Sequence, residues 1–319
     1  MKIIPIFLPY VGCKGRCVFC DQLGATGRVA IPTFEEIGRI IEEYSRTSSE
    51  YELAFYGGTF TALSVERMRE YLEFVRNFRV VKKLRVSTRP DEVTPEKLAV
   101  LREYGVETVE VGVQSFDEEV LTLSGRGYGT EVAERACRMV KEWGFTLGVH
   151  LMLGLPGSNK KIEILSALRA VECGADLVRL HPTLVLKGAE LYKMYTKGEY
   201  KPLSLEEAVE LCSDLLTVLE GWGVKVVRIG YYIPPDQAEN VAAGPFDPSL
   251  GDKVRKRVVE KIFERLRPKK VVVPSCYRGW LKDPIGAEVF EGEDFSFDEL
   301  GYSDALFLLG KEVVECLNS

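Results

Sequence analysis

Short apolar runs alternate with amphipathic stretches along the first 230 residues. The β-branched runs are typical of buried strands, and we expect strands near Ile3–Leu8, Glu52–Tyr56, Lys83–Thr88, Thr108–Gly112, Thr146–Leu151 and Asp176–Leu180, with Val224–Ile229 as a candidate seventh. The stretches between them repeat apolar residues at helical spacing, which predicts helices near Thr33–Ser45, Ser64–Asn77, Thr94–Tyr104, Thr130–Trp143, Lys160–Cys173 and Ser204–Trp222.

This alternation predicts parallel strands joined by right-handed helical crossovers. Six such units fit a partial (β/α)6 barrel of the TIM type better than a short doubly wound sheet. In barrels of this type the chemistry lies at the carboxyl ends of the strands. The residues that follow each predicted strand are therefore the candidates for a functional site.

The pattern changes after about residue 230. The stretch Gly244–Pro248 is rich in turn-forming residues, and a basic helix is expected over Asp252–Leu266. One more strand, Lys270–Val273, and a helical segment, Leu306–Leu317, complete the chain. We expect a barrel over residues 1–235 and a small α/β extension over residues 240–319.

Composition narrows the class of protein. Among 319 residues, 46% are hydrophobic and 28% are charged, with a formal net charge of −6. These proportions are typical of globular proteins and exclude disordered or fibrous classes. The net charge disfavours general affinity for nucleic acid but allows a local basic patch. No apolar run approaches the length of a membrane helix, and we expect a cytoplasmic protein.

Three cysteines stand directly after the first predicted strand. Cys13, Cys17 and Cys20 form a Cys-x3-Cys-x2-Cys motif. Three thiolates can hold three corners of a [4Fe–4S] cluster and leave one iron open. Structural zinc usually takes four protein ligands, and His150 and His181 are the only histidines. Zinc binding and unliganded thiols stay open as alternatives, and the other five cysteines are expected to pack as small apolar residues.

The segment Cys13–Cys20, with Phe19 before its last cysteine, resembles the signature of radical S-adenosylmethionine (SAM) enzymes. The resemblance implies that SAM chelates the open iron of the cluster. It implies that one electron cleaves SAM to methionine and a 5′-deoxyadenosyl radical, which abstracts hydrogen from a substrate. It places Phe19 near the adenine, and it implies reduced ferredoxin or flavodoxin as the electron donor.

The other strand ends extend this resemblance. Gly57-Gly58-Thr59 resembles the glycine motif whose backbone receives the SAM amino group, and Ser87 stands where relatives often carry a glutamate. Gln114 and Arg126 resemble a pair that lies against SAM in coproporphyrinogen-oxidase-like and Elongator-catalytic-subunit-like members. The resemblance therefore implies a set of SAM contacts consisting of Phe19, Gly57, Gly58, Thr59, Ser87, Gln114, Arg126 and His150.

The segment His181–Leu191 is similar to the corresponding segment of the Elongator catalytic subunit, which modifies the wobble uridine of tRNA. That subunit also has an acetyltransferase domain with an Arg/Gln-x-x-Gly turn. No Arg or Gln after residue 227 has a glycine three places on, so we expect this domain to be absent. The stretch Asp252–Lys270 holds nine basic and three acidic residues. This is typical either of a basic face that binds RNA phosphates or of a solvated helix face, and both interpretations stay open.

These observations predict a radical SAM enzyme whose substrate is RNA, with tRNA as the preferred class. A second hypothesis is oxidation of a tetrapyrrole, by likeness to coproporphyrinogen oxidase. A third is an iron–sulfur or zinc binding module without catalysis. No catalytic side chain is assigned, because the barrel motifs describe cofactor binding and are shared across unrelated substrates.

Overall fold

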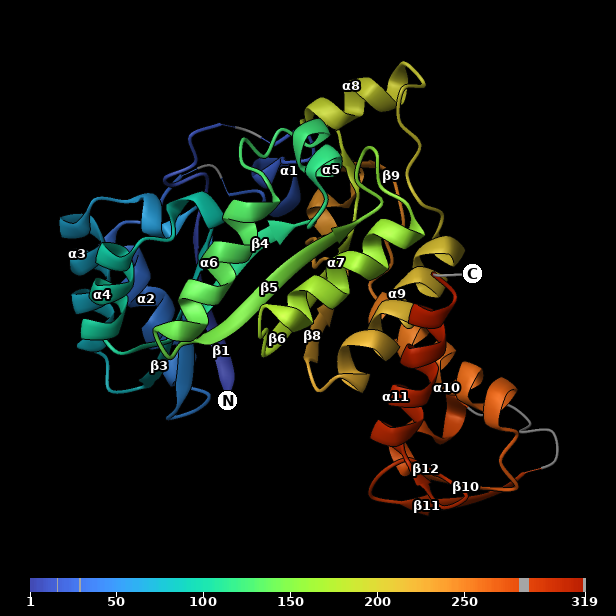
Figure 1. Ribbon diagram of the computed structural model, residues 1–319. Helices are drawn as coiled ribbons and strands as arrows, with labels where there is room; N and C mark the ends of the chain where they lie inside the picture. The colour runs from blue at the N-terminus through green and yellow to red at the C-terminus, as the bar shows by residue number, and fades with distance from the viewer. Residues whose placement is uncertain (16, 29, 281–286, 318–319) are drawn as a thin grey trace.

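The computed structural model describes residues 1–15, 17–28, 30–280 and 287–317. Its centre is a curved sheet of parallel strands in the order β1-β2-β3-β4-β5-β6-β8 (Figure 1). The strands are β1 Lys2–Leu8, β2 Tyr51–Gly57, β3 Val81–Thr88, β4 Val106–Gln114, β5 Thr146–Leu153, β6 Leu177–Pro182 and β8 Lys225–Ile229. The expected partial barrel is confirmed, and the candidate seventh strand joins the same sheet.

Long helices lie along the outside of this sheet (Figure 1). They are α2 Phe34–Ser45, α3 Val65–Arg76, α4 Pro95–Glu103, α6 Thr130–Glu142, α7 Lys160–Glu172 and α9 Leu205–Gly221. Thr33 and Glu36 form a capping box at the start of α2. Within the described part of the chain, no helix combines the length and apolar character needed to cross a bilayer.

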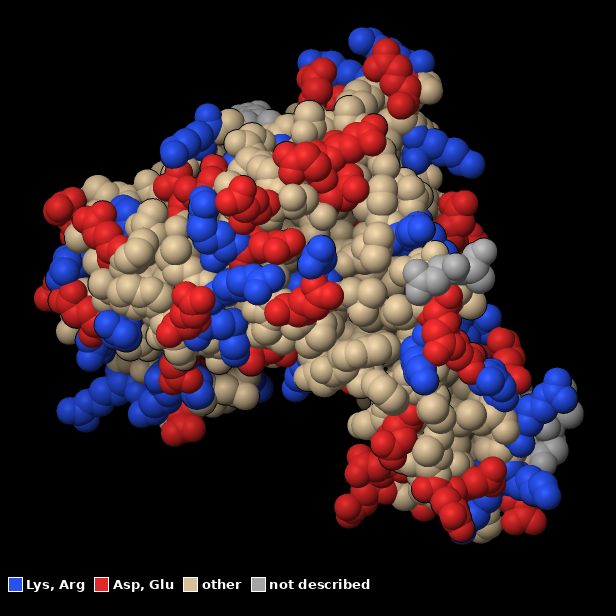
Figure 2. All heavy atoms as spheres, in the orientation of Figure 1, with Lys and Arg blue, Asp and Glu red and all other residues tan. Residues whose placement is uncertain are grey.

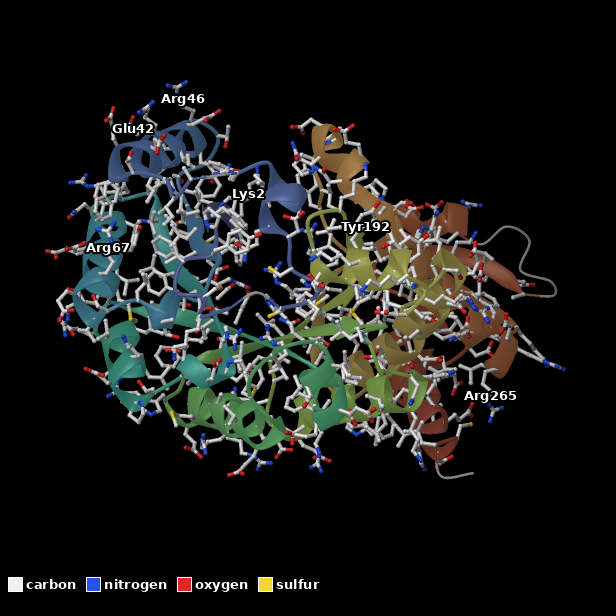
Figure 3. The ribbon with its side chains drawn as sticks, turned by 90° about the horizontal axis from the view of Figure 1, so that it is seen from above. Lys2, Glu42, Arg46, Arg67, Tyr192 and Arg265 are labelled. Atoms are coloured by element: carbon white, nitrogen blue, oxygen red, sulfur yellow. The ribbon has the colours of Figure 1, made fainter. Side chains whose placement is uncertain are left out.

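Short elements that the sequence did not reveal gather where the strands end. They are α1 Gln22–Thr26, α5 Glu118–Leu123, α8 Glu190–Thr196, β7 Val185–Leu186, β9 Val241–Ala243 and the 3-10 turns η1 Phe60–Ala62, η2 Pro90–Glu92 and η3 Pro235–Asn240. β7 and β9 pair as a separate antiparallel ribbon. These elements border the upper end of the barrel in Figure 1, which is the end viewed in Figure 3.

Each strand presents different chemistry on its two sides, because side chains alternate along a strand. Outward residues such as Leu53, Val86 and Val109 are fully buried in one hydrophobic core together with the helices. Inward residues are often charged, as at Arg85 and Glu110, and these two are also buried. The inner face of the sheet is therefore polar, and the outer face, which the helices cover, is apolar.

The C-terminal part of the chain packs on α9. It contains α10 Leu250–Leu266, β10 Lys270–Pro274, η4 Ser275–Trp280, β11 Glu288–Gly292, β12 Ser296–Phe297, β13 Leu300–Gly301 and α11 Tyr302–Glu315. Residues 281–286 of the expected extension lie outside the described residues. A Cβ atom at Gly310 would meet the carbonyl oxygen of Thr217 at 2.6 Å, so α11 and α9 approach closely. The hydrophobic core continues from the barrel into this part.

Most cations of the basic helix have intramolecular partners. Six of the nine basic residues in 252–270 pair with carboxylates, and these are Lys253, Arg255, Lys256, Arg257, Lys261 and Arg265. Figure 2 shows acidic and basic atoms interleaved over this lobe. These ion pairs favour the alternative of a solvated helix face, and contact of this stretch with RNA stays a prediction. Their charges are largely used to attach α10 to its neighbours.

We predict that Lys261→Met destabilises the protein. The Lys261 ammonium lies 2.5 Å from an Asp214 carboxylate oxygen, and both side chains are nearly buried. Removing one partner of such a pair typically costs about 3–5 kcal/mol. We expect about 2–3 kcal/mol from urea denaturation, a smaller loss than that range, because Lys160 also contacts Asp214 at 2.6 Å.

Arg265→Gln is the matched control, because the Arg265–Glu312 pair joins the same helix to α11 but is exposed. Figure 3 shows Arg265 at the outer edge of the C-terminal lobe. Exposed pairs contribute only about 0.2–1 kcal/mol. Equal losses in the two variants would contradict the assignment of Lys261 as an attachment point of α10.

Candidate functional site

The three motif cysteines occupy one loop between β1 and α1. The Cys20 amide donates to the Cys17 carbonyl at 3.0 Å, and Cys17 itself is buried. Burial first, and then the neighbouring Cys17 and Cys13, raise the pKa of the Cys20 thiol to about 12. The loop thus holds three thiols near one another. Among the described residues, no three His, Cys, Asp or Glu side chains are grouped so as to hold a single metal ion.

The glycine motif after β2 fixes the backbone of this loop. A Cβ atom at Gly58 would lie 2.2 Å from the carbonyl oxygen of Val11. The Thr59 amide donates to the same carbonyl at 2.6 Å, and the Thr59 hydroxyl lies 3.5 Å from the Cys13 sulfur. The sequence predicts that these glycines let backbone approach a ligand. In the structure, Gly58 lets two segments of the protein's own backbone approach one another.

Gln22 provides a second attachment that sequence reasoning missed. Its side-chain oxygen accepts from the Tyr10 amide at 2.7 Å, and its side-chain nitrogen donates to the Gly57 carbonyl at 2.5 Å. The first residue of α1 is thereby bonded to both the loop before the cysteines and the end of β2. Gln22 lies two residues past Cys20, but no pattern in the sequence indicates its partners.

Arg126 is a buried cation that bonds the cysteine loop. One guanidinium nitrogen donates to the Cys17 sulfur at 3.0 Å, and the others donate to the Tyr128 hydroxyl and the Gly112 carbonyl. Arg89 places a second guanidinium 3.9 Å from the same sulfur. Within the described chain, Arg126 has no carboxylate partner, and a buried charge without an anion is costly. An anionic thiolate on Cys17, as in an iron–sulfur cluster, fits this arrangement.

Gln114 ends β4 beside Arg126, as the resemblance implies. Its backbone φ is +73°, a conformation that costs energy for a residue with a side chain and is concentrated at functional sites. Its side-chain nitrogen lies 2.9 Å from the position that a Cβ atom at Gly112 would occupy. The side-chain oxygen is buried and lacks a hydrogen-bond partner in the described residues. A bound molecule with an N–H or O–H donor, such as SAM, would satisfy it.

Ser87 and His150 face the interior of the barrel and share one neighbour, Glu110. The Ser87 hydroxyl lies 3.4 Å from a Glu110 oxygen, and the His150 Nε2 atom lies 3.4 Å from the same oxygen. Burial alone would raise the pKa of Glu110, but His150, Arg179 and Arg85 hold it well below its usual value. Sequence reasoning did not single out Glu110. The side chain of Glu110 brings a carboxylate next to Ser87, the position at which relatives often carry a glutamate.

Phe19 packs between two apolar groups. One contains Leu184, Val185 and Tyr200, and the other contains Met152 and Leu155. The aromatic residue of the motif thus links the cysteine loop to the segments that follow β5 and β6. Its predicted position near an adenine stays a prediction.

The other five cysteines divide into two kinds. Cys137, Cys173 and Cys212 are buried, as expected for small apolar residues. The expectation is wrong for Cys276 and Cys316, which are exposed.

A buried carboxyl group supports the loop after β5. Glu163, on α7, accepts from the Gly154 amide at 2.8 Å and from the Ser158 hydroxyl at 2.5 Å. Burial raises the pKa of Glu163 to about 7. The Tyr200 hydroxyl donates to the Gly154 carbonyl at 2.6 Å, so this loop is held from two sides.

A surface groove of about 740 Å³ lies elsewhere, between α7, α9, α10 and α11. Its walls carry paired charges, including Lys261 with Asp214 and Arg257 with Glu210. None of the motif cysteines or predicted SAM contacts lines it. This groove is therefore separate from the predicted site at the strand ends.

Comparison with known families agrees with this geometry. A family model described as the radical SAM superfamily matches residues 7–168, about half of the chain. The chain belongs to the radical SAM superfamily. A second model, the radical SAM C-terminal domain, matches residues 175–260. This membership makes the chain a radical SAM enzyme, and the family implies a [4Fe–4S] cluster and SAM as cofactors.

Curated relatives confirm the resemblance to Elongator proteins. A tRNA uridine(34) acetyltransferase of Methanocaldococcus infernus is 30% identical over 85% of this chain and 59% of that relative. Human Elongator complex protein 3 is 29% identical over 61% of this chain and 40% of that relative. The match thus spans 59% of the first relative and 40% of the second, less than two thirds of either.

Solved structures give the same result for the radical SAM fold. The archaeal Methanocaldococcus infernus Elp3, with an N-terminal deletion, superposes with a TM-score of 0.68 at 25% identity, covering 89% of this chain and 68% of that one. Coproporphyrinogen III oxidase (HemN) of Escherichia coli superposes with a TM-score of 0.52 at 18% identity, covering 70% of this chain and 52% of that one. At 18% identity the second likeness shows the fold alone.

We predict that Gly58→Ala displaces the cysteine loop, because its Cβ atom has no room beside Val11. Overpacking of this kind typically costs about 1–3 kcal/mol. We expect reduced stability in urea and reduced iron content after anaerobic reconstitution. Gly15→Ala is the control in the same loop, since no atom lies within 4 Å of its Cβ position. Equal iron content in the two variants would contradict this role of Gly58.

The Glu163 carboxyl predicts a pH dependence of stability. Its pKa is about 7 in the folded protein against an ordinary value of 4.5, so the folded state binds the proton more tightly. Relative to Glu163→Gln, wild-type stability should fall as pH rises from about 4.5 to about 7, and then stay level. The total difference corresponds to about 3 kcal/mol. Urea denaturation at pH 5 and pH 8 tests this, and parallel profiles for the two proteins would contradict it.

Proposed function

We propose that the chain holds a [4Fe–4S] cluster on Cys13, Cys17 and Cys20, binds SAM at the neighbouring strand ends, and modifies RNA, with tRNA as the class. The observation that carries the proposal is the buried Arg126 guanidinium. It donates to the Cys17 sulfur at 3.0 Å, and it lies near Gly112, as does the side chain of Gln114, whose oxygen has no partner among the described residues. The Arg126 guanidinium would stabilise an anionic Cys17 sulfur in a cluster. The unpaired Gln114 oxygen nearby would accept a hydrogen bond from SAM.

When bound, the cluster and SAM supply a 5′-deoxyadenosyl radical that abstracts hydrogen from the substrate. The protein positions these cofactors and excludes water. Arg126 and Arg89 stabilise negative charge on the Cys17 sulfur. Gln114 would offer its side-chain oxygen to a donor on SAM, and Phe19 joins the cysteine loop to apolar residues such as Val185 and Leu155.

The RNA substrate rests on the relatives, whose printed names include tRNA uridine(34) acetyltransferase. The chain covers 59% of that relative, and acetyl transfer is not part of this proposal. Since most cations of α10 are paired within the protein, we assign RNA contact first to the end of the barrel where the strands finish. We propose reduced ferredoxin or flavodoxin as the electron donor, in the cytoplasm.

We predict that the reconstituted and reduced protein converts SAM to 5′-deoxyadenosine, measured by chromatography, and that Cys17→Ala does not. Arg126→Gln should lower the rate about tenfold or more, because hydrogen bonds from charged groups contribute about 1.5–3 kcal/mol. Arg69→Gln, which removes an exposed pair with Glu103 on the outer helices, is the control and should leave the rate unchanged.

The substrate is tested with two tRNA transcripts that carry uridine or cytidine at position 34, the position named for the relatives. Mass spectrometry should detect a modified nucleoside only in the uridine transcript. A protein with about four irons per chain that forms no 5′-deoxyadenosine with either transcript would contradict the proposed reaction. SAM cleavage without RNA modification would contradict the substrate class.

A further inference from the structure

Charged side chains fill the interior of the barrel, and their charges do not balance. The Arg85 guanidinium bonds both oxygens of Glu52, at 2.9 and 3.0 Å, and also Glu110 at 2.6 Å. Arg179 donates to the same Glu110 oxygen at 3.0 Å. The carboxylates of Glu52 and Glu110 thus neutralise the guanidiniums of Arg85 and Arg179. A third guanidinium, Arg228, reaches the same region and has no carboxylate partner in the described chain.

A bulge in β8 places Arg228 inside the barrel. Val178 pairs with Val226, but Arg179 pairs with Arg228, so Val227 is an extra residue between them. In a regular strand without the bulge, Val227 rather than Arg228 would stand opposite Arg179. Bulges commonly re-aim a side chain next to an active site. Here the bulge sets two arginines side by side on neighbouring strands.

This juxtaposition is unfavourable in the protein alone. Like charges directly opposite one another in a sheet destabilise it, and burial followed by Arg179 lowers the pKa of Arg228. The only hydrogen bond of the Arg228 guanidinium within the described residues runs from Nε to the Gly230 carbonyl, at 3.1 Å. Its two terminal nitrogens therefore keep their donors for another molecule.

A row of rings connects this pair of arginines to the cysteine loop. His181 stacks on Tyr231 with ring centres 4.6 Å apart, and His150 meets His181 edge-on at 5.6 Å. Burial, and then His150, Arg179 and Arg228, hold the pKa of His181 well below its usual value, so this ring is neutral. Tyr231 packs in the same apolar cluster as Val18 and Phe19 of the cysteine loop. Flat neutral rings next to arginines are the surroundings in which proteins hold the base and phosphate of a nucleotide.

We propose that Arg228 and Arg179 form a receptor for a phosphate group of the substrate nucleotide on the inner side of β6 and β8. That the phosphate belongs to RNA rests on the proposed function, whereas the receptor itself does not. The two terminal nitrogens of Arg228 present the forked donors that suit phosphate oxygens. Arg179, which donates to Glu110 and to the Tyr56 hydroxyl, adds a second positive charge beside them. Binding of the anion would offset the repulsion between the two arginines.

Calorimetry on the cluster-reconstituted full chain, with inorganic phosphate as the probe, tests the receptor. Wild type should bind phosphate, and Arg228→Gln should bind it about tenfold more weakly or not at all, as expected when a hydrogen bond to a charged group is lost. Arg228→Lys should fall between them, since lysine keeps the charge but loses the fork. Arg265→Gln, an arginine on the surface of α10, is the control and should match wild type.

The melting temperature without phosphate provides a second readout. Because Arg228 repels Arg179, Arg228→Gln should melt no lower than wild type, whereas a structural arginine would lower the melting temperature when replaced. A lower melting temperature for Arg228→Gln than for Arg265→Gln would therefore overturn the proposal. The absence of phosphate binding to wild type, or equal binding to Arg228→Gln, would also overturn it.

Acetate at the same ionic strength distinguishes phosphate from a carboxylate. Affinity for acetate equal to that for phosphate would overturn the assignment to phosphate. The proposed function fails separately, if tRNA is left unmodified while phosphate binding remains intact and dependent on Arg228.

Discussion

Glu110 is the anion on which the interior of the barrel depends. Its carboxylate accepts from arginines on β3 and β6 and lies next to a histidine on β5. Parallel strands in a closed or half-closed barrel are buried on both sides, so an interior charge must find its partner on the inner face. Glu110 makes it possible to place several cations there while the outer face stays apolar. The polar inner face is thus a property of the whole sheet rather than of any one strand.

The cysteine loop depends in the same way on distant segments. Its backbone is bonded by Thr59, its side chains by Arg126 and Arg89, and its far end by Gln22. Leu191, at the start of α8, donates its amide to the Val18 carbonyl at 2.7 Å. Elements from the first, second, third, fourth and sixth strand ends therefore meet at this loop. Such a loop keeps its conformation through contacts with the rest of the fold.

Periodicity was sufficient to predict all seven strands and the six long outer helices, because each has enough residues to display its repeat. It failed for α1, α5, α8 and the β7–β9 ribbon, which are too short to do so. The family resemblance proposed Gln114 and Arg126 as SAM contacts. The structure brings both near Gly112 at the end of β4, and their contact with SAM stays a prediction. The pairing of Glu110 with Arg179 could not be predicted, because 69 residues separate them. For the same reason the ion pairs between the basic stretch and carboxylates on α9 and α11 could not be predicted.

The contact between Gly58 and Val11 has a consequence for how the protein is assembled. In small zinc domains the metal supplies much of the folding energy, and the chain without metal is unfolded. Here the loop that bears the thiols is shaped by the end of β2, which must already lie beside β1 in the sheet. We therefore expect the polypeptide to fold without iron. Cluster insertion would then follow folding, and we expect a chain that has lost its iron to remain folded and ready for reloading.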